Sequence, residues 1–304
     1  MRETSITVHA MRARRVDRIA TSVLIAIAAS LCLLLGIMIG YVLVMGAGKM
    51  FDPSFLFGKP QQFKAGGGIG PELFNSFYLL VITLIISVPL ALGAAIFLVE
   101  YAPDNVIVHV AKMAIEVLAS LPSIVVGLFG FLFFVLMMGW GFSIISGALA
   151  LTMFNVPILV RVIQQALESV PLDQRDAGLA LGMTRWETTL FILLPAAMPA
   201  IITGIILSAG RVFGEAAALI YTAGQSAPVL DFTCFDLTNP SCPWNIFRPA
   251  ETLAVHIWKI NSEGVVPDLT AISDGTAAVL LVCILLFNLV ARFIGRTLSR
   301  RLSA

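Results

Sequence analysis

An arginine and a glutamate interrupt an otherwise apolar stretch of this chain. Arg211 and Glu215 lie in a run that begins at Thr188 and continues towards Ala223. Charged side chains at membrane depth are costly and usually functional. A spacing of four residues on one helix predicts that Glu215 holds the guanidinium of Arg211 in place. Because a guanidinium offers a planar fork of donors that matches oxyanions, the pair is either an anion site or a structural ion pair between helices.

A second chemically informative stretch covers residues 170–187. Pro171 and Asp173 predict the start of a helix. Gly182 predicts its end, and the Thr184–Glu187 spacing predicts a capping box that opens a second short helix. Taken alone, this pattern is also compatible with an ordinary amphipathic connector.

The composition identifies the environment in which these residues act. Of the 304 residues, 59% are hydrophobic and 12% are Asp, Glu, Lys or Arg, whereas soluble domains carry about a quarter charged residues. The formal net charge of +1 excludes a polyanion-binding protein steered by its overall charge. We therefore predict an integral membrane protein.

Stretches free of charged residues predict six membrane-spanning helices and an all-α, polytopic fold. They are 19–48, 73–99, two helices within 117–160, a fifth from 188 through Arg211 towards Ala223, and one around 275–291. Arginines gather before residue 19, at 161–185 and after 291, so the positive-inside rule predicts that both termini are cytoplasmic. The first helix is too long for a cleaved signal peptide, so we expect a retained anchor.

The expected organisation follows from these spans. It consists of a cytoplasmic basic segment (1–18), a first transmembrane helix (19–48), a periplasmic loop (49–72), a core domain (73–298) with short cytoplasmic helices at 171–187 and a periplasmic loop at 224–274, and a cytoplasmic tail (299–304).

The cysteines and histidines add little chemistry. A disulfide between Cys234 and Cys242 and a pair of reduced thiols are both compatible with the sequence. His109 and His256 lack metal-ligand spacing, so we expect both to be solvated in loops and predict no metal site. We find no Walker loop, catalytic triad or metal motif, so we expect the chain to have no enzymatic activity of its own and to bind no cofactor.

The connector resembles the signature loop of the permeases of ABC importers. The resemblance rests on Asp176-Ala177-Gly178, on Gly182 four residues later and on Leu194-Pro195. Asp176 replaces the usual Glu and Gly178 the second Ala, which keeps an acid and a small residue. The resemblance implies a type I importer permease architecture, with coupling helices that dock on a cytoplasmic ATPase; the residues expected to couple are Asp176, Ala177, Gly178, Gly182 and Arg185.

The arginine-bearing span resembles the A-type permease of the phosphate-specific ABC transporter, which carries an Arg and a Gly-Glu pair there. Residues 120–129 and 156–161 also resemble that family, and the likeness runs from about Asn75 to Arg296. Family members usually have Thr where this chain has Ala216. The resemblance implies that Arg211, Glu215 and Arg161 line the substrate pathway, although the positive-inside rule accounts for Arg161 equally well.

The resemblance implies one permease half of an ATP-driven phosphate importer in a bacterial inner membrane. The implied partners are a second, homologous permease, two ATPase subunits that bind ATP and Mg²⁺, and a periplasmic phosphate-binding protein. Nothing in the sequence suggests a nucleic-acid partner. Two alternatives remain open at this point: a permease for another oxyanion such as molybdate or sulfate, and a secondary transporter or channel, which would need no coupling loop.

Overall fold

The computed structural model describes residues 2–61, 65–226, 228–264 and 267–302, which form helices and loops only. In chain order the elements are α1 (Arg2–Met50), α2 (Pro53–Phe57), α3 (Gly70–Ile96), η1 (Phe97–Tyr101), α4 (Val106–Ala119), α5 (Ser123–Gly130), η2 (Phe131–Met137), α6 (Ile144–Glu168), α7 (Leu172–Ala180), α8 (Arg185–Thr188), η3 (Thr189–Leu193), α9 (Leu194–Phe213), α10 (Ala217–Thr222), α11 (Leu253–Glu263) and α12 (Leu269–Leu302), where η marks π-helical turns. The expected all-α class is confirmed.

The six expected spans correspond to five long helices and one bent pair. Among the described residues, five runs are long and apolar enough to cross a membrane, namely Val16–Met50, Gly70–Tyr101, Ile144–Glu168, Arg185–Phe213 and Leu269–Gly295. The bent pair is Val106–Ala119 with Ser123–Met137, at an angle of 100°.

The bend in this third span was not expected from its apolar composition. Pro122 is the N-cap of α5 with ψ of 135°, and a proline disfavours the α conformation in the residue before it. The helix therefore ends at Ala119 and restarts at Ser123. The range of 117–160 expected for the third and fourth spans begins too late, because α4 already begins at Val106.

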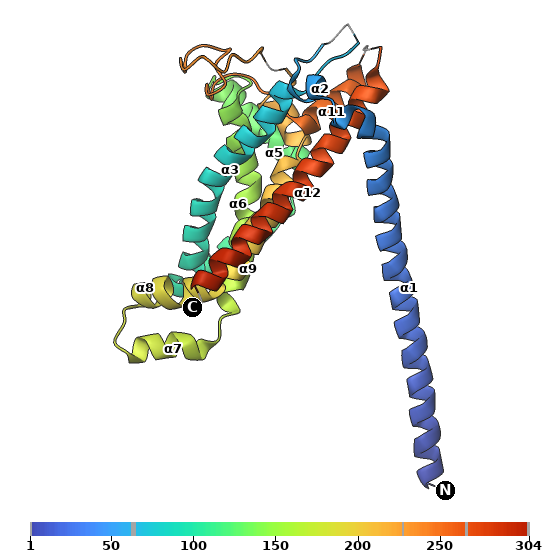
Figure 1. The fold of residues 1–304 in the computed structure, drawn as a ribbon. Helices are drawn as coiled ribbons and strands as arrows, with labels where there is room; N and C mark the ends of the chain where they lie inside the picture. Colours follow the sequence, from blue (N-terminus) through green and yellow to red (C-terminus); the bar gives the residue numbers. More distant parts are fainter. Residues whose placement is uncertain (1, 62–64, 227, 265–266, 303–304) are drawn as a thin grey trace.

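Both chain ends lie at one end of the molecule. Figure 1 shows the N- and C-terminal labels there, together with α7 and α8. The loops around α2 and α11 lie at the opposite end. This arrangement agrees with an even number of crossings, and the distribution of arginines predicts that the end with the termini is cytoplasmic.

Helix α1 is set apart from the rest of the bundle. It runs unbroken from Arg2, so the structure has no boundary at residue 18 between a basic segment and a span. Figure 1 shows its N-terminal half diverging from the other helices, and all side chains of residues 16–39 are exposed. Its C-terminal end reaches the bundle, where the Nζ of Lys49 lies 3.6 Å from Asp268. The exposed apolar length is suited to contact with lipid.

The expected outer loops contain helices. Residues 49–72 include α2 and the first turn of α3, which begins at Gly70. Residues 224–274 include α11 and the start of α12.

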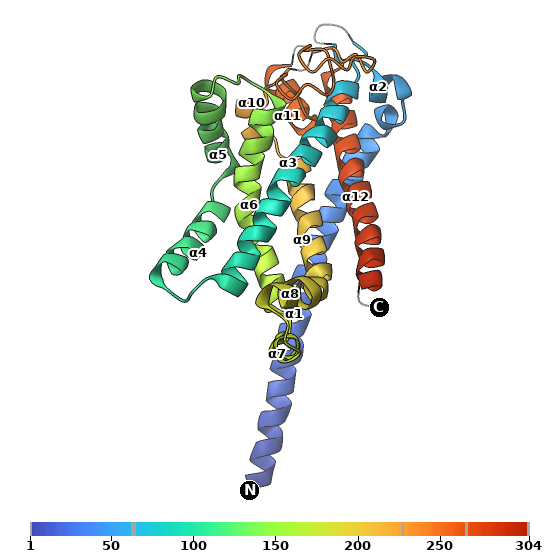
Figure 2. The ribbon, with the colours of Figure 1, turned by 90° about the vertical axis from the view of Figure 1, so that its left-hand side faces the viewer.

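Helices α3, α6, α9 and α12 form the core that positions the functional residues (Figure 2). One buried apolar cluster includes Phe55, Leu151 and Phe213, and a second includes Ala95, Ile163 and Ile201. Buried polar groups also join three of these helices. The Nδ2 of Asn155 in α6 donates to the Ser87 hydroxyl of α3 at 3.1 Å, and Ser208 of α9 donates to the Asn155 Oδ1. Hydrogen bonds of this kind fix the packing of helices in lipid.

Candidate functional site

The cytoplasmic connector folds as two short helices, as the sequence predicted. Helix α7 covers Leu172–Ala180 after the N-cap Pro171. Thr184 and Glu187 form the expected capping box at the start of α8. Gly182 adopts φ of +83° between the two helices, a conformation that costs L residues with a side chain about 1–2 kcal/mol. Figures 1 and 2 show α7 and α8 projecting from the cytoplasmic end of the bundle.

Gly178 is the close-packing residue of this connector. It is buried, and a Cβ placed on it would stand 2.7 Å from the Ile192 Cδ1 and 3.0 Å from the Thr188 Cγ2. The small residue therefore lets α7 lie against the turn that leads into α9. The other residues expected to couple, Asp176, Ala177 and Arg185, are exposed.

An ion pair that the sequence did not predict ties the connector to the bundle. Arg175 of α7 pairs with Glu100 at the end of the second span. The Glu100 side chain is 3% exposed and that of Arg175 is 29% exposed. A buried carboxylate needs a partner. The position of Glu100 at the end of an apolar run was therefore the sequence feature that could have predicted this ion pair.

Arg211 lies in the last turn of α9 and is exposed on the isolated chain. Its guanidinium carbon lies 4.1 Å from the centroid of the Phe154 ring in α6. Phe154 itself is 1% exposed, so the ring is a fixed platform. Within the described part of the chain, no hydrogen bond or ion pair engages the Arg211 guanidinium.

The expected pairing of Arg211 with Glu215 was wrong. Helix α9 ends at Phe213 with Gly214 as its C-cap, and α10 starts at Ala217. The break turns Glu215 away from the helical position one turn beyond Arg211. Its carboxylate instead accepts a bond from the Ala218 N–H at 3.4 Å, at the start of α10. Of the described residues, none brings a carboxylate within 4.0 Å of Arg211.

Arg161 lies on the same helix as the Phe154 platform. It is seven residues further along α6 and exposed. Seven residues are close to two helical turns, or about 10 Å. Helical geometry thus places Arg161 near the same face of α6 as Phe154, the ring that Arg211 contacts, and nearer the expected cytoplasmic end.

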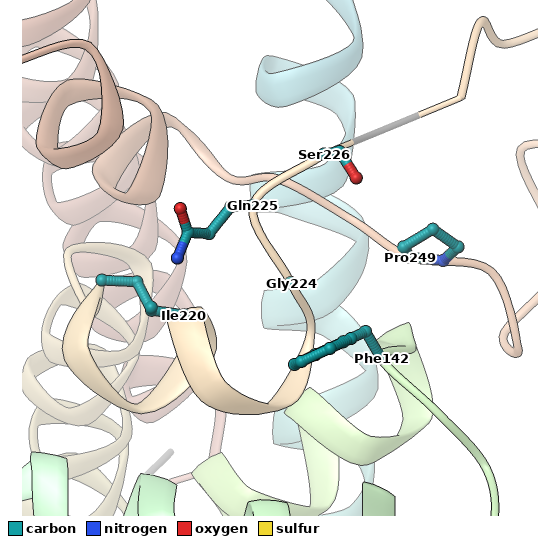
Figure 3. A pocket seen from close by; sticks show the side chains of 6 residues that line it. All are labelled: Phe142, Ile220, Gly224, Gln225, Ser226 and Pro249. Atoms are coloured by element: carbon teal, nitrogen blue, oxygen red, sulfur yellow. The ribbon is translucent and has the colours of Figure 1, made fainter. Parts of the chain in front are cut away.

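A pocket opens beyond α10, at the outer end of the segment that carries Glu215. Its volume is about 480 Å³, and it is lined by Phe142, Ile220, Gly224, Gln225, Ser226 and Pro249. Figure 3 shows these residues around the end of α10. The sequence gave no signal for this pocket, because its lining comes from three separate segments.

The loop between α10 and α11 is organised by a buried arginine. Arg248 is 1% exposed. Its Nη2 donates to the Asn75 Oδ1 at 2.8 Å and to the Pro243 carbonyl at 3.1 Å, and its Nε donates to the Cys242 carbonyl at 3.2 Å. Burial lowers the pKa of Arg248 to about 10.

The two cysteines of this loop are free thiols in the structure. Cys242 donates its thiol to the Cys234 carbonyl oxygen at 3.1 Å, so the disulfide alternative is not the one observed.

The expectation that His256 is solvated in a loop was wrong. His256 lies in α11 and is 6% exposed, with its Nδ1 2.7 Å from a Glu251 oxygen. The Glu72 carboxylate, 4.0 Å from the same nitrogen, completes a buried group. His109 is exposed as expected, although in helix α4 rather than in a loop.

Comparison with known proteins finds relatives in sequence and in fold. Residues 87–304 match the family described as binding-protein-dependent transport system inner membrane component. The chain is 48% identical, over 97% of its length and 100% of the relative, to the probable ABC transporter permease protein YqgI of Bacillus subtilis. It is 33% identical, over 77% of its length and 75% of the relative, to the phosphate transport system permease protein PstA of Yersinia pestis. Its fold is similar to a chain in the crystal structure of a bacterial ABC transporter that imports the acidic polysaccharide alginate, with a TM-score of 0.53, 13% identity and coverage of 90% of this chain and 96% of that one.

Proposed function

This chain belongs to the family of binding-protein-dependent transport system inner membrane components, and from that membership we propose that it forms half of the pore of an ATP-driven phosphate importer. The chain is a multi-pass inner-membrane permease component. Arg211 and Arg161 contact the anion one after the other. Glu215 contributes to the pathway indirectly, by accepting a hydrogen bond at the start of α10.

The single observation that carries the anion pathway is the uncommitted guanidinium of Arg211. It lies within the candidate span Arg185–Phe213, fixed by one face to Phe154. A guanidinium facing lipid costs from about 3 to more than 10 kcal/mol, depending on the method. We infer that the exposed side of Arg211 faces a second permease subunit across a polar pathway, where a passing anion supplies the missing counter-charge.

Phosphate is the anion that this group suits. The edges of the guanidinium that stacking leaves open can donate two parallel hydrogen bonds to one oxyanion. The likeness to a permease named for phosphate transport supports this choice. Because no carboxylate of the described residues is bonded to Arg211, the anion need not displace such a partner. Contact with a single arginine keeps anion binding weak enough for release.

Coupling to ATP is assigned to α7 and α8. Leu181 and Trp186 are 82% and 55% exposed at the cytoplasmic end, which is the kind of apolar surface that marks a protein contact. We propose that the segment carrying Asp176, Ala177 and Arg185 docks on an ATPase subunit, while the partly buried Arg175–Glu100 pair transmits its movement to the second span. Two ATPase subunits would bind ATP and Mg²⁺, and a periplasmic phosphate-binding protein would dock above.

The substrate is tested by competition in cells that depend on this transporter for phosphate. Initial uptake of radiolabelled phosphate is measured with a large excess of sulfate, molybdate or arsenate. We expect arsenate, which matches phosphate in charge and shape, to compete, and the other two to have no effect. Transport of labelled sulfate or molybdate would instead support a permease for another oxyanion, and uptake that persists without the ATPase would support a secondary transporter.

The coupling role is tested at Gly182. Gly182→Val places a β-branched residue at φ of +83°, which is strongly disfavoured, whereas Gly182→Asn keeps a residue type that tolerates this conformation. We expect the Val variant to reach the membrane yet lose ATPase co-purification and uptake, while the Asn variant retains both. Equal behaviour of the two variants would remove the turn from the mechanism.

A further inference from the structure

Three buried side chains meet beneath the outer loops, away from the arginines of the pathway. Glu72 lies in the first turn of α3, Glu251 directly precedes the N-cap of α11, and His256 lies within α11. Their exposed fractions are 0%, 2% and 6%. One donor atom from each lies within 4.8 Å of the others. The proposed phosphate pathway uses none of these residues.

Glu72 lacks a partner although it is fully buried. Neither of its carboxylate oxygens accepts a hydrogen bond from the described residues. Among the described residues, the basic atom nearest to this carboxylate is the His256 Nδ1 at 4.0 Å, which is beyond hydrogen-bonding distance. Burying an ionised carboxylate without a partner is very unfavourable. A bound cation would supply the partner that the described residues do not give the Glu72 carboxylate.

Two neighbours hold the Glu251 carboxylate, Lys259 at one oxygen and His256 at the other. The Lys259 Nζ lies 3.0 Å from the Glu251 Oε2 and also donates to the Gln225 carbonyl. The Glu251 Oε1 forms a hydrogen bond of 2.7 Å with the His256 Nδ1, so an ion bound by both atoms would take the place of the proton between them. The lysine thus orients the carboxylate from its far side, which is the arrangement of groups that support a metal ligand.

We propose that Glu72, the Glu251 Oε1 and the His256 Nδ1 bind a divalent first-row transition metal ion, for which Zn²⁺ is the probe. Tetrahedral Zn²⁺ bonds of about 2.0–2.2 Å place ligand atoms roughly 3.4 Å apart. The distances of 2.7 Å and 4.0 Å from the His256 Nδ1 to the two carboxylates bracket that spacing. Two carboxylates balance the charge of the ion, and one imidazole favours zinc-like metals over Ca²⁺ or Mg²⁺.

The ion would fasten the outer end of the bundle. It joins the start of α3 to α11, two segments that are far apart in the sequence. Lys259 extends this connection to Gln225, which lines the pocket beyond α10 (Figure 3). The proposed role is structural: the metal ion holds α11 against the start of α3, next to the residues that follow α10.

The test uses the full-length chain, purified with its transport complex through a tag without histidine. After dialysis against a chelator, the binding of Zn²⁺ is measured by equilibrium dialysis, and Co²⁺ is added to a second sample. We expect one high-affinity ion per chain and Co²⁺ absorption bands in the visible range that Zn²⁺ abolishes. In Glu72→Gln and His256→Gln, which lose a ligand, affinity should fall by about 100-fold or more, beyond the usual effect of removing a supporting partner.

Two controls separate this site from other metal-binding groups. His109→Gln and the double variant Cys234→Ser with Cys242→Ser should bind Zn²⁺ like wild type. Wild-type affinity in Glu72→Gln, or loss of the ion in the cysteine variant, would overturn the proposal. Absence of high-affinity binding to the wild-type complex would also overturn it, and this measurement requires no variant to fold. Phosphate uptake is not the readout, so the result is independent of the proposed substrate.

Discussion

Arg211 and Arg248 carry the same group in opposite surroundings. Arg248 is 1% exposed, and its N–H groups donate to an amide oxygen and backbone carbonyls. Arg211 is exposed and rests on an aromatic ring, with no such bond from the described residues. The hydrogen-bond donors of Arg248 are bonded within the loop, whereas those of Arg211 remain available to a ligand. The hydrogen bonds of Arg248 therefore indicate a structural role, whereas Arg211 stays a candidate for contact with an anion.

The largest expected effect is on folding, at the buried arginine. Arg248→Met leaves the Asn75 Oδ1 and the carbonyls of Cys242 and Pro243 unpaired, and each unpaired buried group costs about 1–3 kcal/mol. We expect the free energy of unfolding to fall by about 3 kcal/mol or more. Thermal unfolding followed by fluorescence-detected size exclusion measures the loss. Unchanged stability would show that Arg248 is not the organising residue of its loop.

An intermediate effect is expected from changing the shape of the charge at Arg211. Arg211→Lys keeps the charge but loses the fork, so one of two hydrogen bonds of about 1.5 kcal/mol is lost and phosphate uptake falls roughly 10-fold. Initial uptake at matched protein levels is the measurement, and Arg292→Lys at the exposed end of α12 is the matched control. Full activity of Arg211→Lys would mean that charge alone suffices.

The smallest expected effect comes from the aromatic platform. Phe154→Leu keeps an apolar side chain but removes a cation–π contact worth about 0.5–1 kcal/mol, so uptake should fall roughly 2- to 5-fold. Measuring the variant at several temperatures separates this effect from a loss of stability. An effect much larger than that of Arg211→Lys would reverse the ranking and assign Phe154 a role beyond positioning.

Much of the fold could be predicted because it depends on local sequence. Runs without charged residues determine where a helix can cross lipid, and Gly182 with the Thr184–Glu187 box predicted the two connector helices. Gly178 could be recognised as a packing residue by its size. Each of these signals involves residues close together in the chain, so a single sequence is sufficient to predict the helices.

The features that were missed depend on chain geometry. The break at Gly214 separates Arg211 from Glu215, although glycine is tolerated within helices, so the sequence alone did not predict it. Glu72 and His256 are brought together by the packing of α3 against α11, and no spacing rule connects them. Burial rather than sequence pattern distinguishes Arg248 from Arg211.

The ratio of phosphate transported to ATP hydrolysed in proteoliposomes measures whether Arg211 contacts the transported anion. The complex is reconstituted with its binding protein, and Arg211→Gln is compared with wild type and with the control Arg292→Gln. Losing two charge-assisted bonds, worth about 3 kcal/mol together, should lower the ratio roughly 100-fold while ATP hydrolysis continues. A wild-type ratio in Arg211→Gln would contradict the account and leave Arg211 with a structural role against Phe154.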